Sequence, residues 1–538
     1  GLFVRNNAEF STCGLNEIRC PWEQGGDPDG HKRACNFHAI SRMGSRNKIR
    51  VASQIGRFGI GFVSVYQVTD APIVRSTGIE MQLIPIDGSG ETKVIPRSGG
   101  TEFELPWAAL ASDTRKGLNA SPTPPDVVRL VVDAITDVMA RGLFFLRNLR
   151  TIELFKNGDF VRSVSIARDG GVIGLEIKPE GRYEKWKILT RDASDLAVER
   201  EIFDDFPTLV ELDRSPIVNI ALPVHEESVD GLLYAYLPTE QASGMPLHIN
   251  ADFFPHPTRR TITLTGEQHE RYWNELLLDA AAKAIAESFE EVRDLIGPRR
   301  LWALVGSAFA LKDKASFQSF WLEIQVAAKA SRSVLTVDDQ MALPSDCHLP
   351  EQLSAEAQAA LASIDVKLLH ADLRPYWSVF QALAALPLRL PALVAALEVT
   401  KITAEDANLQ DLWAAVDAIL AQSKARQDLP ALVSRLKAIK FILDYEGAPA
   451  SIDDLYRPPV GIATARIHRF LPGTPMVQRE VLAFEAVAAL IDVYRFDEFA
   501  RDLAAAIPDE ESASAVIGIG GDGQSAFYAL LPAFVPDG

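Results

Sequence analysis

The sequence predicts an α+β protein whose last part is mostly helical. Runs that alternate apolar and polar residues, typical of strands, follow a helical pattern that begins at position 127. From 267 to 295, apolar residues recur three and four positions apart, as on the buried face of an amphipathic helix. Beyond about 300 the sequence is rich in Ala and Leu and keeps this helical period. We therefore expect strands and helices in separate stretches, with helices dominating the last one.

The chain is long enough for several domains and has an ordinary composition. Its 538 residues exceed what one hydrophobic core serves, and at ~100 to 200 residues per domain about three are expected. Hydrophobic residues make up 47% and charged residues 23%, as in many globular proteins. No window approaches the ~18 uninterrupted apolar residues of a membrane span, and the first residues lack the apolar core of a signal peptide. We expect no membrane association and a cytoplasmic location.

The charge balance argues against one class of partner. The formal net charge is -18, whereas a nonspecific nucleic-acid binder needs a basic surface. Residues 1–110 are nevertheless close to neutral, so the acidic surplus lies further along the chain. Nucleic acid is therefore an unexpected partner, while a small polyanionic ligand is compatible with the first part.

The clearest internal boundary is the stretch ASDTRKGLNASPTPPD at 111–126. Gly, Ser, Thr and three prolines interrupt the apolar pattern there. The stretch predicts a linker between a first domain at 1–110 and a second at 127–300. A third, mostly helical region of unknown role then covers 301–538.

The second domain begins with a helical pattern and continues with strands. The helix is expected in VVRLVVDAITDVMARGLFFLRNL, and the strands in TIELFKNG and VRSVSIARDG. The stretches GLLYAYLP at 231–238 and LHINADFF at 247–254 continue the strand pattern. An α+β domain that closes with the helix at 267–295 follows from this order.

The last region shows helical periodicity most clearly at 408–442 and 477–507, and no repeat with a period of 20 to 50 residues is evident. Its final stretch, AVIGIGGDGQSAFYALLP, reads as strand, glycine turn and strand. Gly518, Gly520 and Gly523 fit the spacing of a dinucleotide-binding loop, but too little chain follows for the helix and parallel strand that such a fold needs. We therefore predict a tight hairpin turn.

The four cysteines are few and irregularly spaced. Neither a disulfide framework nor a CxxC zinc site is indicated. A ligand set can be assembled from Cys13, Cys20, His31 and Cys35, but incidental thiols are the expected interpretation. The sequence thus predicts no metal site in the protein itself.

The stretch QIGRFGIGFVSVYQVTD at 54–70 carries glycines at alternate positions. Such a loop leaves main-chain N–H groups unscreened and allows them to wrap an anion. The residues that follow would supply a helix or strand whose first N–H groups add to the same site. A buried turn packed against a sheet is the alternative interpretation.

The wider pattern resembles the phosphate-cradling loop of the GHKL ATPases, and within them the ninety-kilodalton heat-shock chaperones and sacsin. The resemblance implies a partial GHKL α/β two-layer sandwich, followed by a chaperone-type middle domain, with ATP and Mg²⁺ as cofactors. It also implies that backbone N–H groups from Arg57 to Phe62 hold the β- and γ-phosphates. The nucleotide-binding residues expected in this loop are Gly56, Arg57, Phe58, Gly59, Ile60, Gly61 and Phe62.

Two further stretches are similar to parts of the same pocket. In NFHAISRMGSRNK at 36–48, Asn36 matches a residue that touches the nucleotide, and Arg42 matches one that approaches its phosphates. In SGGTEFELP at 98–106, Thr101 matches the hydroxyl of the Gly-Thr turn that closes the adenine side. The resemblance therefore adds Asn36, Arg42 and Thr101 to the expected binding residues.

A later stretch resembles the sacsin pattern around the catalytic arginine of the chaperones. It runs through GLLYAYLPTEQASGMPLHINADFFPHPTRR and then YWNELLLDA. By this resemblance Arg259 or Arg260 is the catalytic residue that neutralises charge on the transferred phosphoryl group. A surface ion-pair cluster is the alternative for these two arginines.

Two motifs of the family are missing. The family places Glu-x-x-x-Asn on one helix, but the glutamates in residues 1–35 are followed four positions on by Cys13, Pro21 and Asp27. The Asp-x-Gly-x-Gly motif is approached only by DPDGHK at 27–32. Either the chain is a fragment that begins inside the ATPase domain, which we favour, or the site has degenerated. We expect weak ATP binding and slow or absent hydrolysis, so whether the chain is an enzyme stays open.

The leading functional hypothesis is an ATP-binding, ATP-hydrolysing chaperone-like protein that couples nucleotide state to a conformational change on protein clients. The partners implied are protein clients or partner proteins, with a homodimer as one option. A nucleotide-independent scaffold that uses the helical C-terminal part for protein interactions is the alternative. A nucleic-acid-acting enzyme of the MutL type is disfavoured by the acidic balance.

Overall fold

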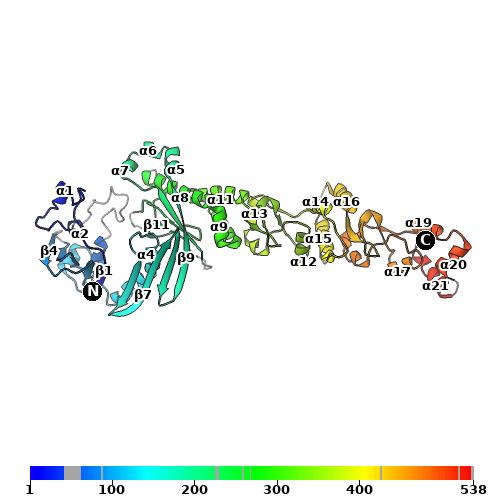
Figure 1. Ribbon diagram of the computed structural model, residues 1–538, viewed down its shortest axis with the longest axis horizontal. Helices are drawn as coiled ribbons and strands as arrows, with labels where there is room; N and C mark the ends of the chain where they lie inside the picture. The colour runs from blue at the N-terminus through cyan, green and yellow to red at the C-terminus, as the bar shows by residue number, and fades with distance from the viewer. Residues whose placement is uncertain are drawn as a thin grey trace. The chain divides into compact units, whose positions relative to one another are not determined.

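The computed structural model has the α+β fold that the sequence predicts, in two compact units. Unit 1 comprises Gly1–Ile285 and Leu311–Trp321, and unit 2 comprises Ala286–Ala310 and Leu322–Gly538 (Figure 1). The structure describes residues 1–41, 62–85, 89–224, 229–256, 258, 260–266, 268–406, 408–423, 427–518 and 521–534.

Unit 1 begins with a five-stranded antiparallel sheet, the first sheet, in the order β1-β5-β2-β3-β4. Val74 lies opposite both Phe103 and Met81 in the register. The turn between the second and third strands has Thr77 and Gly78 at positive φ, which suits the twist of a tight hairpin. The strands are β1 (Leu2–Asn6), β2 (Ile73–Ser76), β3 (Ile79–Ile84), β4 (Ser89–Val94) and β5 (Thr101–Leu105).

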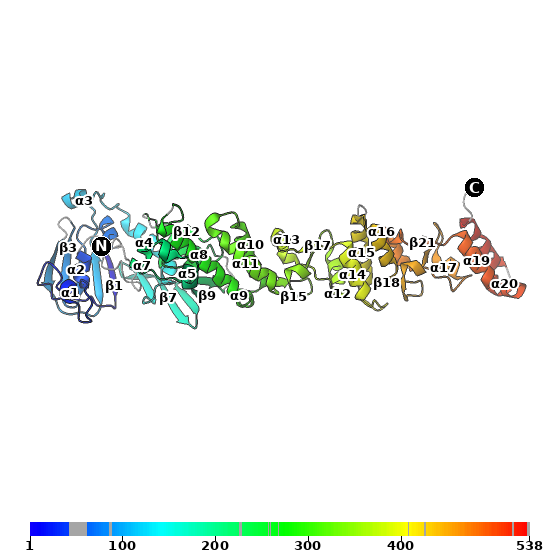
Figure 2. The same ribbon diagram turned by 90° about the horizontal axis from the view of Figure 1, so that it is seen from above.

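Short helices cover this sheet. The helix α2 (Asn36–Ser41) lies beside the strands of the first sheet (Figure 2). Its Phe37 ring is fully buried in one cluster with Val74, Met81 and Leu83. The stretch after the glycine loop forms a short 3-10 helix, η1 (Phe62–Gln67), and a one-turn helix, α1 (Trp22–Gly25), precedes α2. Burial of these apolar side chains is what attaches the helices to the sheet.

Residues 111–126 contain a short helix, α3 (Asp113–Gly117), capped by the Ser112 hydroxyl. The Arg115 side chain is almost completely buried and donates hydrogen bonds to the carbonyls of Tyr66 (2.5 Å) and Gln67 (2.8 Å). Arg115 also lies 3.4 Å from the carboxylate of Asp70. These bonds join the 111–126 stretch to the end of η1.

The next part of unit 1 is an eight-stranded second sheet, in the order β12-β11-β13-β10-β9-β8-β7-β6. The pairings are antiparallel except for the parallel pair β11 and β13. The strands predicted in TIELFKNG and VRSVSIARDG are confirmed, while GLLYAYLP is split at Tyr236, whose positive φ turns the chain back on itself. The elements are β6 (Thr151–Lys156), β7 (Asp159–Asp169), β8 (Val172–Lys178), β9 (Arg182–Asp192), α5 (Ser194–Glu199), α6 (Ile202–Asp205), α7 (Thr208–Glu211), β10 (Ile217–Pro223), β11 (Leu232–Ala235), β12 (Leu237–Ala242) and β13 (His248–Asn250).

The helix α4 (Val127–Leu143) packs on this second sheet, against β6, β7 and β12 (Figure 1). Its buried residues Met139 and Leu143 belong to one core cluster with Leu175 and Trp186 of the strands. The helix predicted at 267–295 is two helices, α8 (His269–Glu287) and α9 (Phe289–Ile296). The prediction was therefore right in type and missed the break at Ser288.

His248 is buried in the second sheet as a neutral imidazole. Its ring stacks on Trp186 with centroids 5.1 Å apart, and its Nδ1 accepts the N–H of Leu232. Burial lowers the pKa of His248 to about 4, and the positive charge of Arg141 adds to the effect. Protonation would place a charge inside the core and remove the acceptor for Leu232.

We expect this histidine to make unit 1 less stable in acid. Because the folded-state pKa lies below the unfolded value of about 6.5, the unfolded chain binds the extra proton between these values, and stability falls as the pH falls. The loss between pH 7 and pH 5 is about 2 kcal/mol in free energy of unfolding. Urea titrations at both pH values would measure it in the wild type and in His248→Gln, which keeps an acceptor without titrating. An equal acid loss in both proteins would contradict the assignment.

Unit 2 contains the same order of elements twice. Each copy begins with a short hairpin and ends with a strand that pairs in parallel with an earlier one. The first copy comprises β14 (Val334–Leu335), β15 (Met341–Ala342), η3 (Pro344–Asp346), β16 (His348–Leu349), α12 (Ala355–Ser363), η4 (Ala371–Tyr376), α13 (Trp377–Ala382) and β17 (Leu386–Pro387). The second comprises β18 (Lys440–Leu443), β19 (Pro449–Ser451), η5 (Ile452–Asp454), β20 (Tyr456–Arg457), α17 (Thr464–His468), η6 (Arg479–Ala483), α18 (Glu485–Ala488) and β21 (Asp492–Val493).

Corresponding bridges in the two copies are separated by one constant interval. The antiparallel bridge of Thr336 to Leu369 recurs as Asp444 to Val477, and the parallel bridge of His348 to Leu368 recurs as Tyr456 to Met476, each 108 positions further along. This interval is longer than the periods considered from the sequence, and few side chains are shared between the copies. The repetition therefore lies in backbone pairing and in burial more than in residue identity.

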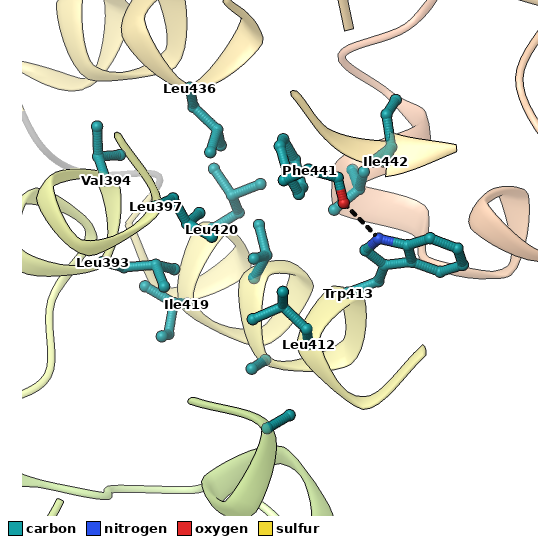
Figure 3. Packing of buried hydrophobic residues seen from close by; sticks show 14 of the residues in the cluster. Leu393, Val394, Leu397, Leu412, Trp413, Ile419, Leu420, Leu436, Phe441 and Ile442 are labelled. Atoms are coloured by element: carbon teal, nitrogen blue, oxygen red, sulfur yellow. Dashed lines mark hydrogen bonds between the residues drawn. The ribbon is translucent and has the colours of Figure 1, made fainter. Parts of the chain in front are cut away.

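A tryptophan anchors each hairpin to a preceding helix. Trp302 of α10 (Pro298–Ala310) donates its indole N–H to the carbonyl of Ser333 at 2.8 Å. Trp413 of α15 (Leu409–Gln422) donates to the carbonyl of Phe441, also at 2.8 Å (Figure 3). Around Trp413, Figure 3 shows the apolar side chains of the unit 2 core converging from several helices.

The remaining elements before the C-terminal helices are η2 (Ala315–Phe317), α11 (Gln318–Ala330), α14 (Leu390–Val399) and α16 (Leu429–Lys437).

The C-terminal stretch is helical, so the predicted strand, glycine turn and strand are wrong. After α19 (Phe496–Ala506) come α20 (Glu510–Ile517), α21 (Gly521–Tyr528) and η7 (Leu531–Ala533). The carboxylate of Asp509 accepts the N–H of Ser512 and caps α20, and Gly518 ends this helix at a φ of 85°. Helix capping and a glycine at the helix end outweighed the local apolar run. Gly520 lies outside the described residues.

Candidate functional site

Most of the predicted nucleotide loop lies outside the described residues. This applies to Arg42, Gly56, Arg57, Phe58, Gly59, Ile60 and Gly61, and also to Arg259. The structure places Asn36, Phe62, Thr101 and Arg260, so the geometry of the site is built from these four and their surroundings.

Asn36 is the first residue of α2 and its side chain is exposed. Its side-chain oxygen accepts the hydroxyl of Ser11 at 3.0 Å, and its backbone N–H donates to the same Ser11 oxygen at 3.1 Å. This reciprocal pair ties the start of α2 to the segment that follows β1. The amide of Asn36 is thus fixed at the surface of the first sheet.

Thr101, the first residue of β5, is buried and its hydroxyl is engaged inside the protein. It donates to the carbonyl of Ala8 at 2.7 Å and lies 2.9 Å from the hydroxyl of Ser76. The preceding Gly100 has a φ of 84°, and a Cβ added there would lie only 2.2 Å from the carbonyl oxygen of Asn6. Only glycine fits this close approach, which gives the Gly-Thr turn a structural reason.

An aromatic cluster at the first sheet lies beside those predicted nucleotide-binding residues that the structure describes there. The ring of Phe62 lies 5.8 Å from that of Phe103, and Phe10 lies 5.9 Å from Phe103. Phe10 also packs edge-on against Phe37 at 5.3 Å, and its N–H donates to the Ser76 hydroxyl. Phe62 therefore belongs to this cluster, Asn36 directly precedes its member Phe37, and Thr101 adjoins it through the Ser76 hydroxyl.

Arg260 lies beside the second sheet rather than in this cluster. Its guanidinium is 3.5 Å from the carboxylate of Glu240, and both side chains are about 70% exposed, at 71% and 68%. Its carbonyl accepts the N–H of Glu240 at 2.7 Å. Such an exposed pair contributes little to stability, roughly 0 to 1 kcal/mol.

The segment that leads to the arginine pair is clamped by the Trp-Asn motif at the start of α8. Asn274, fully buried, accepts the N–H of Phe254 at 2.7 Å and donates to the carbonyls of Phe254 and Thr263, both at 2.9 Å. Trp273 donates its indole N–H to the carbonyl of Asp252 at 3.0 Å. The sequence assigns no role to Trp273 and Asn274 of YWNELLLDA, and the structure gives these two residues one.

A buried ion pair completes the clamp. The carboxylate of Asp252 accepts the guanidinium of Arg214 at 2.6 Å and the N–H of Ser215 at 3.1 Å. Both side chains are at most 5% exposed, and the guanidinium also lies 3.7 Å from the centre of the Phe254 ring. Charge pairing and ring stacking together hold the chain just after β13.

A cavity of about 430 Å³ lies over the second sheet, with Arg168 and Asn250 in its lining. Arg168 donates to the carbonyls of Leu143 (2.9 Å) and Leu146 (2.8 Å) and so caps the end of α4. Burial lowers the pKa of Arg168, and the nearby Arg150 lowers it further. The side-chain oxygen of Asn250 accepts the N–H of Tyr236. Both side chains are thus held by hydrogen bonds within the fold, and the lining of the cavity also contains Arg147, Tyr236 and Asp252.

Three cysteines and one histidine converge beside the first sheet. Cys13 and Cys20 come from the irregular segment after β1, Cys35 immediately precedes α2, and His38 lies on α2. The Sγ atoms of Cys13 and Cys35 are 3.7 Å apart, and Nδ1 of His38 lies 3.4 Å and 3.2 Å from them. All four potential ligand atoms, including Cys20 Sγ, lie within 4.8 Å of one another.

This cluster contains the three cysteines of the ligand set assembled from the sequence, but it does not contain His31. His31 belongs to a separate turn, where the carboxylate of Asp27 accepts the N–H groups of Asp29 and His31, and its side chain is mostly exposed. His38 takes its place. The signal for His38 was available in the Cys35-x-x-His38 spacing, which places two ligands one helical turn apart.

The comparisons with known proteins give one match. Residues 33–90 match the family model described as Sacsin domain. The Sacsin-domain segment thus contains Asn36, the glycine loop and the strands β2 and β3, and it begins two residues before Cys35. No curated protein and no solved structure matches the chain.

Within the described ranges, no helix combines the length and the apolar content that crossing a membrane would need.

Proposed function

We propose that the chain is a sacsin-related, chaperone-like protein whose Sacsin-domain segment binds ATP with Mg²⁺ and couples nucleotide state to a conformational change on protein clients. The observation that carries this proposal is the Sacsin-domain match at 33–90, because that segment contains the glycine loop at 54–62. Backbone N–H groups of such a loop suit the β- and γ-phosphates of a nucleotide.

In this proposal each named residue has one task. Asn36 contacts the nucleotide, Arg42 approaches the phosphates, and the backbone from Arg57 to Phe62 holds them. Mg²⁺, when bound with ATP, neutralises phosphate charge. Arg259 or Arg260 supplies positive charge to the transferred phosphoryl group. Asn274 acts through the backbone of Phe254 and Thr263 as a positioning residue for the segment that carries both arginines.

Two features support weak binding and slow hydrolysis. Residues 1–35, ahead of the glycine loop, contain no Glu-x-x-x-Asn motif to activate water and hold the metal. The Thr101 hydroxyl already donates to the carbonyl of Ala8, so an adenine contact through this hydroxyl requires that hydrogen bond to break. Exchange of one buried hydrogen bond for another yields little net binding energy, on the order of 1 kcal/mol or less.

Binding of radiolabelled ATP to the full chain in the presence of Mg²⁺ tests the nucleotide part. We expect weak, saturable binding that Gly59→Val lowers at least tenfold, because the added side chain would screen the anion-binding N–H groups. Gly142→Val is the matched control, since a Cβ at this helical position meets no atom within 4 Å. ATP binding that is absent at millimolar concentration, or equal in the Gly59 variant, would remove ATP from the proposal. Rapid turnover would contradict the expectation of slow hydrolysis.

The two copies of the repeat at 334–493 favour a second candidate function, that of a nucleotide-independent scaffold. Repeated units present extended surfaces that commonly bind other proteins. Suppression of the aggregation of a heat-unfolded model client by the full chain, measured with and without ATP and Mg²⁺, separates the candidates. Suppression that changes with nucleotide supports the chaperone, while equal suppression supports the scaffold. Light scattering of the same sample tests whether the chain forms the homodimer that we include in the proposal.

A further inference from the structure

The structure assigns a zinc site to Cys13, Cys20, Cys35 and His38, a site that holds α2 against the first sheet. Zinc takes three thiolates and one imidazole in many structural sites, with tetrahedral coordination. The inference concerns this cluster alone and does not depend on nucleotide binding.

The distances suit this metal. With Zn–S bonds of about 2.3 Å and Zn–N bonds of about 2.0 Å, neighbouring ligand atoms of a tetrahedral site are about 3.5 to 3.8 Å apart. The separation of Cys13 Sγ and Cys35 Sγ is 3.7 Å, and His38 Nδ1 lies 3.4 Å and 3.2 Å from these two atoms. No pair of the four ligand atoms exceeds 4.8 Å, so small rotamer adjustments centre an ion among them.

The surrounding groups orient the ligands for a cation. Nε2 of His38 lies 3.0 Å from the carbonyl oxygen of Glu17, and an Nε2–H donated there leaves the lone pair of Nδ1 for the metal. The backbone N–H of Cys35 donates to Sγ of Cys20 at 3.2 Å, a bond that stabilises a thiolate. Cys20, Cys35 and His38 are buried and Cys13 is partly buried, which limits exchange of the ion with solvent.

The cluster also compensates for a small local core. Residues 7–21 contain no regular element, and α2 has only six residues, so backbone pairing alone gives this corner little stability. Bound zinc would tie Cys13 and Cys20 of this segment to both sides of Asn36, since Cys35 precedes and His38 follows it. Zinc ligation of this kind contributes directly to folding free energy.

The metal content of the purified full chain tests the inference. After expression with Zn²⁺ and removal of loosely bound metal by gel filtration, we expect about one zinc per chain by mass spectrometry of metals. Cys20→Ser and His38→Gln are expected to lose most of it. Cys347→Ser and His31→Gln are the matched controls and are expected to keep it, because Cys347 lies in unit 2 and His31 in a separate turn. Zinc retained in both ligand variants, or absent from the wild type, would overturn the site.

A second measurement uses the wild type alone, in case a variant fails to fold. Replacement of zinc by Co²⁺ is expected to give the intense visible absorption of tetrahedral cobalt together with thiolate-to-cobalt charge transfer. Intact-mass analysis under non-reducing conditions should show four reduced cysteines. A disulfide between Cys13 and Cys35, or cobalt that gives only the weak spectrum of octahedral coordination, counts against the site.

Discussion

Asp252→Ala is expected to lower the free energy of unfolding of unit 1 by about 3–5 kcal/mol, because it leaves the buried guanidinium of Arg214 without its carboxylate. The two groups are 2.6 Å apart and at most 5% exposed, so the variant removes a close counter-charge from a guanidinium that is almost completely shielded from water. The variant also removes the acceptor for the N–H of Ser215. Urea unfolding at pH 7, with hydrogen exchange of peptides from β10 and β13 to locate the effect, would measure the loss.

The double variant Arg214→Met with Asp252→Ala provides the control. The double variant removes the guanidinium together with its counter-charge, and replacement of a buried ion pair by apolar groups is often nearly neutral in stability. We therefore expect the double variant to recover most of the loss, although the contact of the Arg214 guanidinium with the Phe254 ring is lost with it. A double variant less stable than Asp252→Ala, or a single variant within about 1 kcal/mol of wild type, contradicts the assigned cause.

Asn274→Ala is expected to cost at least about 3 kcal/mol. It leaves the N–H and carbonyl of Phe254 and the carbonyl of Thr263 without the amide that satisfies them, and each unsatisfied buried group costs roughly 1–3 kcal/mol. The side chain is fully buried, so a cavity adds to the loss. Unfolding in urea and exchange rates of amides in the 251–266 segment would measure both effects.

Asn274→Asp separates the hydrogen bonds from the packing. The aspartate keeps an acceptor for Phe254 and fills the same volume, but it cannot donate to the two carbonyls. It should therefore destabilise without creating a cavity, whereas Asn408→Ala should have little effect, since the Asn408 side chain makes no capping bond to α15. If the aspartate variant is as stable as wild type, the two hydrogen bonds that Asn274 donates add nothing to the free energy of unfolding. In that case Asn274 stabilises this segment by packing alone.

Regular elements were predicted best where the local signal and the tertiary structure agree. The strands β6 and β7 and the helix α4 show periods of two and 3.6 that the second sheet and its core retain. At the C-terminus the apolar run and three glycines suggested a hairpin, but the carboxylate cap from Asp509 and the helix end at Gly518 produced two helices. An apolar run of this length is compatible with either form, and capping decided between them.

The 108-residue repeat in unit 2 was not predicted, because only periods of about 20 to 50 residues were expected from the sequence. Its two copies preserve the positions of the bridges, and a tryptophan of a preceding helix bonds an equivalent carbonyl in each, Ser333 and Phe441, while most other side chains differ. Backbone hydrogen bonds carry no side-chain signature. For this reason the pairing of Thr336 with Leu369 and of Asp444 with Val477 could be recognised only in three dimensions.

The sequence by itself determined the α+β class and the Gly-Thr turn, because each depends on neighbours along the chain. Only the tertiary structure decided which residues meet. In the structure the Thr101 hydroxyl donates to a carbonyl of the protein itself, and Asn274 holds the segment that leads to the two arginines. The structure also brings His38 rather than His31 to the cysteines. The physical reason is that a ligand cluster requires contacts of a few ångströms between segments that are distant in the sequence. Such contacts arise when the segment with Cys13 and Cys20 folds onto α2, and no pattern of neighbouring residues predicts them.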